Sequence, residues 1–286
     1  MLFRNSFILL CCFFTSSAFA TRWFEIEVLI YKQRPAPYLQ EDFSLKHDEI
    51  NAKNKLDLLT PALEEQARQA CIEGDSRFKS NSFTDSLVSN SPHSNVCDDS
   101  VDFLSSYTQL PVTPSVKSRE DTNEIYLIAS SDLQFTEQKN QLDRKGLTPI
   151  LHTGWRFPEM SQSRAPSIRL FAGEHLQAEQ STTPNVDDDF ISLVSPTQQY
   201  IPDTIQSAPK WELDGLMKIY VRHYLFINAD FDISKRLETG DYEKARFSQF
   251  KRVISNEIHY FDHPRMGMIV QIPVSYTHLT LPTNRE

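Results

Sequence analysis

The feature that most constrains this chain is a stretch of alternating polarity in residues 215–233, GLMKIYVRHYLFINADFDI. Its odd-numbered positions are almost all apolar, whereas its even-numbered positions mix aromatic, charged and amide side chains. Because side chains alternate between the two faces of a β-strand, this period of two predicts one long strand with one face in a core. Burying a large aliphatic side chain contributes roughly 1.5–3 kcal/mol, so we expect neighbouring segments to assemble on that face.

The opposite face of this predicted strand carries a candidate ligand-binding set. Its members are Lys218, Tyr220, Arg222 and Tyr224; we expect the last three to be exposed, with Lys218 alongside them. Sugar rings stack on flat aromatic side chains, and cations pair with carboxylates such as those of cell-wall peptides. The alternative is that a helix covers this face and that the rings belong to an ordinary core.

Both ends of the chain carry segments that we set apart from the fold. Residues 1–20 combine one basic residue, an apolar run and small residues before Ala20, which predicts a cleaved secretory signal peptide. A lipoprotein signal that uses Cys11 or Cys12 would leave a shorter apolar run than export usually needs. Residues 275–286 resemble translated adapter sequence, and we expect a non-native tail there, with a genuine flexible end as the alternative.

Export would place the two remaining cysteines, Cys71 and Cys97, in an oxidising compartment. We predict a disulfide between them, with two separately buried thiols as the alternative. In the chain-entropy treatment, such a bridge stabilises the fold by roughly 3.5 kcal/mol. The formal net charge of −9 argues against nucleic acid as a partner. After the signal peptide the sequence contains no apolar run long enough to predict a membrane span.

The N-terminal half of the mature chain reads as strands and helices around an irregular insertion. Residues 21–33 alternate as a strand, and residues 60–72 carry a helix signature with Thr60 as the N-cap and Gly74 at the end. Residues 75–122 show little periodicity and are expected to form a long insertion.

A strand–helix–strand unit follows the insertion. We expect strands at residues 124–130 and 147–157, joined by a helix that Ser131 or Asp132 caps and that Gly146 ends. Short turns between these elements predict a right-handed parallel crossover, as in half of a ferredoxin-like sheet.

Three segments near the C-terminus predict an antiparallel meander. They are residues 216–233, 251–261 and 266–272, the last two joined by a turn at residues 263–267. We therefore predict an α+β fold with a ferredoxin-like strand–helix–strand half, a C-terminal antiparallel meander and a long irregular insertion. The expected units are residues 21–160, with a loop insertion at residues 34–122, and residues 161–274.

The most enzyme-like cluster contains His259, Asp262 and His263, which His223 and Glu257 could join as a zinc-type ligand set. The alternative is that Asp262 and His263 only support a tight turn. No nucleophile elbow of the G-x-S-x-G type and no phosphate-binding glycine loop occurs in the chain. We therefore assign no catalytic residue, cofactor or metal ion, and keep a metal-dependent cell-wall hydrolase using His259 and His263 as the alternative function.

Three blocks together carry a family resemblance. They are RWFEIEVLIYKQ at the mature N-terminus, LMKIYVRHYLFINADFDI, and EIHYFDHPRMGMIVQI, of which residues 257–267 are the most specific part. In order and spacing, the chain resembles the CsiV family of peptidoglycan-binding periplasmic proteins involved in cell-shape integrity.

The resemblance implies a non-enzymatic protein of the Gram-negative periplasm. It also implies peptidoglycan as a ligand, and a role in glycan-strand synthesis together with an outer-membrane lipoprotein activator of a bifunctional penicillin-binding protein. The resemblance supplies no catalytic residues, which agrees with the absence of catalytic motifs.

Overall fold

The structure is a computed structural model of the 286-residue chain. It describes residues 22–34, 49–78, 97, 102–119, 123–176 and 210–273. The predicted signal peptide, the predicted non-native tail and about half of the predicted insertion at residues 75–122 lie outside these residues.

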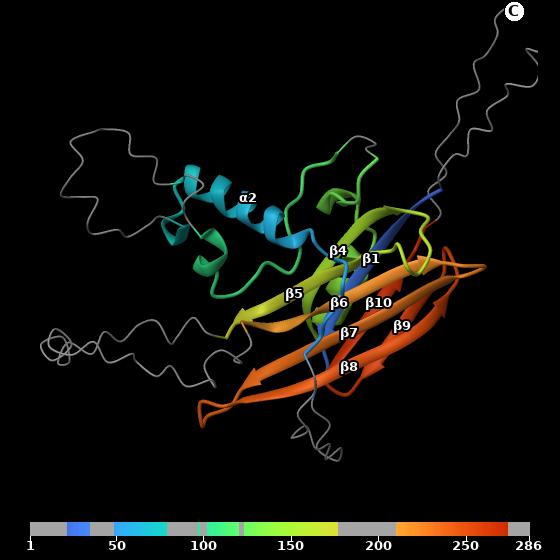
Figure 1. The fold of residues 1–286 in the computed structure, drawn as a ribbon. Helices are drawn as coiled ribbons and strands as arrows, with labels where there is room; N and C mark the ends of the chain where they lie inside the picture. Colours follow the sequence, from blue (N-terminus) through green and yellow to red (C-terminus); the bar gives the residue numbers. More distant parts are fainter. Residues whose placement is uncertain are drawn as a thin grey trace, which may run out of the picture.

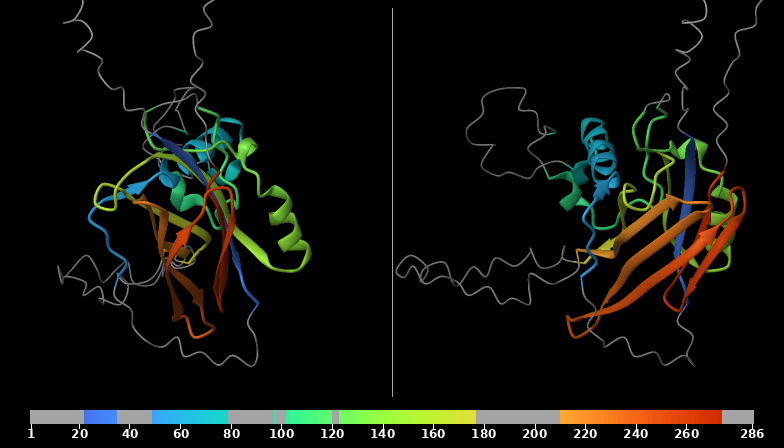
Figure 2. Two further views of the ribbon diagram at one scale, coloured as in Figure 1. Left: turned by 90° about the vertical axis from the view of Figure 1, so that its right-hand side faces the viewer. Right: turned by 45° about the vertical axis from the view of Figure 1, so that its right-hand side comes forward.

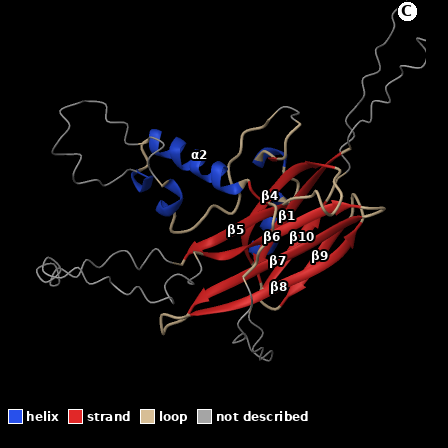
Figure 3. Cartoon of the chain, viewed as in Figure 1, coloured by secondary structure: helices blue, strands red, loops and turns tan. Residues whose placement is uncertain are grey.

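Strands dominate the described part of the chain and form two five-stranded sheets (Figure 1, Figure 3). Sheet A contains, in order, β3 (Tyr126–Leu127), β4 (Thr148–Pro158), β1 (Trp23–Lys32), β10 (Met266–Gln271) and β9 (Ile258–His263). Sheet B contains β2 (Lys55–Asp57), β5 (Ser167–His175), β6 (Trp211–Val221), β7 (Leu225–Arg236) and β8 (Tyr242–Val253). The α-helices in the described ranges are α2 (Leu59–Ile72) and α4 (Thr136–Arg144), so the predicted α+β class is confirmed.

The two sheets face each other and share one hydrophobic core (Figure 2). Alternate residues of β1, such as Ile26 and Val28, point into this core, as do Ile227 and Phe231 of β7. The sheets approach each other along β8 and β9, where the Lys251 ammonium donates to the Tyr260 carbonyl at 2.8 Å. The inner faces bury their apolar side chains against each other in this shared core.

Helix α2 adds its own apolar side to the same core. Its buried residues are Leu59, Leu63, Ala67 and Cys71, which recur at the spacing of one helix face. The predicted disulfide is confirmed, since Cys71 bonds to Cys97 with their Cα atoms 5.9 Å apart. No helix in the described ranges is both long enough and apolar enough to cross a membrane.

The prediction of one long strand at residues 215–233 is wrong, because this stretch is a hairpin. β6 ends at Val221, β7 starts at Leu225, and these two residues lie opposite each other. Three residues form the turn, so odd-numbered positions face the core on both strands. The alternation therefore runs through the turn without a break, and no glycine or proline marks it.

The predicted meander also needs correction. Residues 251–261 are not one strand, because β8 ends at Val253 in sheet B and β9 begins at Ile258 in sheet A. Asn256 adopts a positive φ of 66° in the connecting turn, a conformation that asparagine tolerates better than most residues. The meander in the structure is β6–β7–β8, and the predicted hairpin of β9 and β10 is confirmed in sheet A.

The predicted parallel crossover is wrong as well. Strand, helix and strand occur in the expected order, but β3 is only two residues long and pairs antiparallel with β4. Tyr126 lies opposite Arg156, near the end of β4, so α4 belongs to the segment that returns the chain to the start of that strand. Pairing direction is decided between segments, and local periodicity does not encode it.

The helix ends were predicted correctly, but the helix starts were not. Gly74 and Gly146 adopt positive φ angles after α2 and α4, as glycine does at helix C-termini. At the start of α2, the Asp57 carboxylate, rather than Thr60, accepts from the Leu59 and Thr60 amides at 3.1 and 2.9 Å. Neither Ser131 nor Asp132 caps α4, because Glu27 of β1 accepts the amide hydrogen bonds there.

Strand β1 connects the two predicted units. It lies between β4 of the N-terminal unit and β10 of the C-terminal unit in sheet A. The proposed division at residue 160 stays a prediction.

Candidate functional site

The outer face of sheet B carries a stack of three aromatic rings, which we call the aromatic strip. Tyr220 of β6 stacks on Phe226 of β7 with ring centroids 5.4 Å apart, and Phe226 stacks on Phe250 of β8 at 5.6 Å. The planes of Phe226 and Phe250 differ by only 3°. The three rings therefore form one continuous stack across three adjacent strands.

Exposure increases along the aromatic strip. Tyr220 is 5% exposed, Phe226 is half-buried, and Phe250 is 61% exposed. An exposed phenylalanine of this kind costs solvation free energy unless something covers it when the protein functions. The strip thus has a rigid buried base and an open ring at its end.

Cations and a further ring surround the strip at the β6–β7 turn. Tyr224 is 54% exposed, and the Arg252 guanidinium lies 4.5 Å from its ring centroid. Arg222 donates to the Gln162 amide oxygen at 2.6 Å. Within the described ranges, neither arginine has a carboxylate at ion-pair distance, so their charges remain available to an anionic ligand.

Farther along the same face, opposite charges neutralise each other. Arg169 bonds to Asp214 at 2.6 Å, and Arg246 bonds to Asp232 at 2.6 Å. These pairs leave little net charge on the part of sheet B near Asp214. The cationic and aromatic character therefore concentrates at the end near the β6–β7 turn.

The structure brings the four predicted site residues to one end of the sheet but does not expose all of them. Arg222 and Tyr224 are exposed as expected, and Lys218 is half-buried. Tyr220 is buried, so its predicted exposure is wrong. Its ring stacks on that of Phe226 on the neighbouring strand. The binding role of the set stays a prediction.

Sequence reasoning did not single out Phe250 and Arg252. Both lie on β8, and only the β7–β8 register places them beside β7, with Arg252 opposite Phe226. A local signal existed, because Phe250 and Arg252 occupy alternate positions in a strand. Nothing in that pattern indicates which strand they adjoin.

The histidines proposed for a zinc site contact the backbone instead. His259 Nε2 accepts from the Ile254 amide at 2.9 Å, and His263 Nδ1 accepts from the Arg265 amide at 3.2 Å. The part of the chain that the structure describes contains no group of three or more histidine, cysteine or acidic residues arranged to hold a metal ion.

A second polar network lies on the outer face of sheet A. The Tyr260 hydroxyl donates to Asp262 at 2.8 Å and receives hydrogen bonds from Tyr31 and Gln33. Burial, followed by the hydrogen bonds to Tyr31 and Asp262, raises the pKa of Tyr260 above its ordinary value. This hydroxyl therefore stays protonated at neutral pH and serves as a hydrogen-bond donor rather than a nucleophile.

The fold and this surface define an α+β two-sheet protein with an exposed aromatic and cationic face. A family model described as "Peptidoglycan-binding protein, CsiV" matches residues 2–274, which is nearly the whole chain. The chain belongs to the CsiV family, and the resemblance read from the three sequence blocks is confirmed. Neither a curated protein nor a solved structure matches the chain.

Membership of the CsiV family indicates what kind of ligand the protein binds. The family is described by peptidoglycan binding, and peptidoglycan is a component of the cell envelope. The description names a ligand and no reaction.

Proposed function

We propose that this protein binds peptidoglycan in the periplasm and supports cell-wall synthesis by helping an outer-membrane lipoprotein activator stimulate a bifunctional penicillin-binding protein. Membership of the CsiV family supports the ligand. The predicted signal peptide and the disulfide between Cys71 and Cys97 support an oxidising compartment outside the cytoplasm.

The observation that carries the proposal for the binding face is the aromatic strip. A sugar ring has one apolar face of C–H groups, which stacks on an exposed aromatic ring such as Phe250. Tyr224 offers a second exposed ring, and the Arg252 guanidinium lies over one face of that ring. Lys218, Arg222 and Arg252 supply the positive charge that attracts the peptide carboxylates of the wall.

The rigidity of the strip favours binding. Tyr220 and Phe226 are fixed by stacking and burial, so Phe250 loses little side-chain freedom when a ligand covers it. Most of the side-chain entropy that an ordered site requires is therefore lost during folding and not on ligand binding.

Co-sedimentation of the mature protein with purified, protein-free sacculi tests the binding face. We expect Phe250→Ala to weaken sacculus binding by about tenfold, since a buried aromatic contact of roughly 1.5 kcal/mol is lost. Tyr224→Ala and Arg222→Ala should each weaken binding less. Ile72→Ala is the matched control, because Ile72 is 64% exposed but lies on α2.

Wild-type protein that stays in the supernatant at every salt concentration would contradict the proposed ligand. Unchanged binding by folded Phe250→Ala and Tyr224→Ala variants would keep the ligand but reject this face. Binding that weakens with added salt would assign part of the affinity to the three cations.

Reconstitution tests the proposed partnership. Glycan-strand synthesis by the penicillin-binding protein is measured with its lipoprotein activator, in the presence and absence of this protein. We expect faster synthesis only when the activator is also present. An unchanged rate in the complete mixture would reject the partnership.

A further inference from the structure

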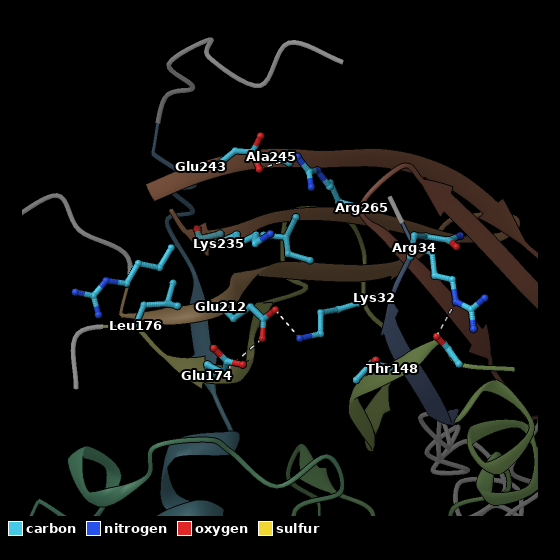
Figure 4. Close-up of a pocket in the computed structure, with 15 residues that line it drawn as sticks. Lys32, Arg34, Thr148, Glu174, Leu176, Glu212, Lys235, Glu243, Ala245 and Arg265 are labelled. Atoms are coloured by element: carbon cyan, nitrogen blue, oxygen red, sulfur yellow. Dashed lines mark hydrogen bonds and ion pairs between the residues drawn. The ribbon is translucent and has the colours of Figure 1, made fainter. Parts of the chain in front are cut away.

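A second candidate site lies at the opposite end of the two sheets, in a cleft of about 440 Å³ that we call the end cleft (Figure 4). Sheet A contributes the end of β1, with Lys32 and the following Arg34, and the β9–β10 turn with Arg265. Sheet B contributes Glu212 of β6 and Lys235 of β7, among others. This volume lies within the usual range of about 300–1,000 Å³ for small-ligand pockets.

Two ion pairs join the sheets across the end cleft. The Lys32 ammonium bonds to the Glu212 carboxylate at 2.9 Å, and the Arg265 guanidinium bonds to the Glu243 carboxylate at 2.7 Å (Figure 4). Each pair connects a residue of sheet A to a residue of sheet B, and all four side chains are partly buried. The two pairs therefore tie the sheets together across the cleft.

The charges that line the end cleft are not balanced. Its described lining residues include five cations and three carboxylates, in a chain with a formal net charge of −9. The Arg34 guanidinium donates to the carbonyls of Lys145 and Gly146 at 2.6 and 3.0 Å. Lys235 lies opposite Glu243 in the β7–β8 register, but the Glu243 carboxylate is bonded to Arg265.

Apart from Arg236, three charged groups of the cleft remain for a ligand: Arg34, Lys235 and Glu174. Within the described ranges, Arg34 and Lys235 have no carboxylate at ion-pair distance, and Glu174 has no cation. Two positive groups and one negative group suit a ligand that carries carboxylates beside an ammonium group. A phosphate fits less well, since it carries no ammonium group to pair with Glu174.

We propose that the end cleft binds a short peptide through its free carboxylates, with Arg34 and Lys235 as the carboxylate-binding residues and Glu174 facing an ammonium group. The proposal rests on the proposed function, because within it the peptide is the stem peptide of peptidoglycan. The Nε and Nη2 groups of Arg34 already donate to the Gly146 and Lys145 carbonyls, so Arg34 offers a carboxylate its charge and its Nη1 group, and Lys235 offers a point charge.

The end cleft is distinct from the aromatic strip. Phe226 and Lys235 lie near opposite ends of β7, about 30 Å apart at the ordinary rise of a strand. Because peptidoglycan is a polymer of many units, the two sites can engage different units of the wall at once, which increases the overall affinity.

Isothermal titration with a sugar-free stem peptide, released from purified sacculi by amidase digestion, tests the end cleft. We expect Lys235→Ala and Arg34→Ala each to weaken peptide binding about tenfold or more, as the loss of one charged hydrogen bond predicts. A peptide with amidated carboxyl groups should bind the wild type as weakly as the unmodified peptide binds a variant that combines Arg34→Ala and Lys235→Ala. Lys53→Ala is the matched control, because Lys53 is exposed and lies beside the other end of β5.

The outcomes separate this inference from the proposed function. Equal affinity of the Lys235→Ala variant and the wild type, or equal binding of the amidated peptide, overturns the end-cleft proposal. If the wild-type protein sediments with sacculi but does not bind the free peptide, the end-cleft proposal is overturned and the proposed function is retained. If the protein binds the peptide in a Lys235-dependent way but does not sediment with sacculi, the end-cleft proposal is supported and the proposed function is overturned.

Discussion

Glu27 of β1 connects sheet A to the start of α4 through a carboxylate that is almost fully buried. Its two oxygens accept from the Gln134 amide at 2.8 Å and from the Phe135 amide at 2.6 Å. The same carboxylate is hydrogen-bonded to His152 Nε2 of β4 at 2.7 Å. A carboxylate at a helix N-terminus also interacts favourably with the helix dipole.

The Glu27→Ala substitution removes the acceptor for all three donors. A buried donor left without a partner costs about 1–3 kcal/mol. Gln134 is exposed, so water can reach its amide. Most of the lost free energy therefore comes from the Phe135 amide and the His152 ring, which are left buried without this acceptor. We expect the free energy of unfolding to fall by about 3–5 kcal/mol, the usual range when one partner of a buried pair is removed.

Urea unfolding of the mature protein measures this loss. The buried Trp155 and Trp211 report the transition by fluorescence. Glu27→Gln keeps one acceptor oxygen of similar shape, so its loss should be intermediate. Glu65→Ala is the control, because Glu65 lies exposed on α2 and its loss should change stability by less than about 0.5 kcal/mol.

A Glu27→Ala variant within about 1 kcal/mol of the wild type would refute the reasoning. It would mean that α4 starts without help from β1, or that water enters and satisfies the donors. A double-mutant cycle of Glu27 and His152 then shows how much of any loss belongs to that pair.

Two further predictions concern stability. Replacing Cys71 and Cys97 by serine should lower the free energy of unfolding by about 3–4 kcal/mol, measured by urea unfolding; an unchanged midpoint would contradict this. Burial, followed by the charge of Lys210, lowers the pKa of His175, so the unfolded chain binds a proton more readily. Stability should therefore decrease as the pH falls below 6.5, and the decrease should be smaller in His175→Phe, as urea midpoints at two pH values would show.

Elements whose signals are local were predicted well from the sequence. The strand at residues 21–33, helix α2 and the β9–β10 hairpin each carry a pattern and an end signal within a few residues. Gly74 and Gly146 end their helices because glycine adopts positive φ at little cost. The disulfide followed from the export signal and an even cysteine count.

The candidate sites needed information from outside their own segments. Arg222 and Tyr224 could be named from the alternation of residues 215–233, but Phe250 joins them only through the β7–β8 register. The end cleft combines the end of β1 with Lys235, more than two hundred positions later in the chain. No local pattern relates two segments that far apart.

The sequence by itself determined which residues face a core, where most elements end and which family the chain belongs to. The tertiary structure alone decided that residues 215–233 fold back on themselves, because a three-residue turn preserves the parity of inward-facing positions. It also decided that β8 and β9 belong to different sheets, and that Asp57 and Glu27 cap the helices. The same reason explains the hairpin, the split between sheets and the helix caps. Hydrogen-bond partners and neighbouring strands are set by which segments meet in space, whereas periodicity shows only which face of an element is buried.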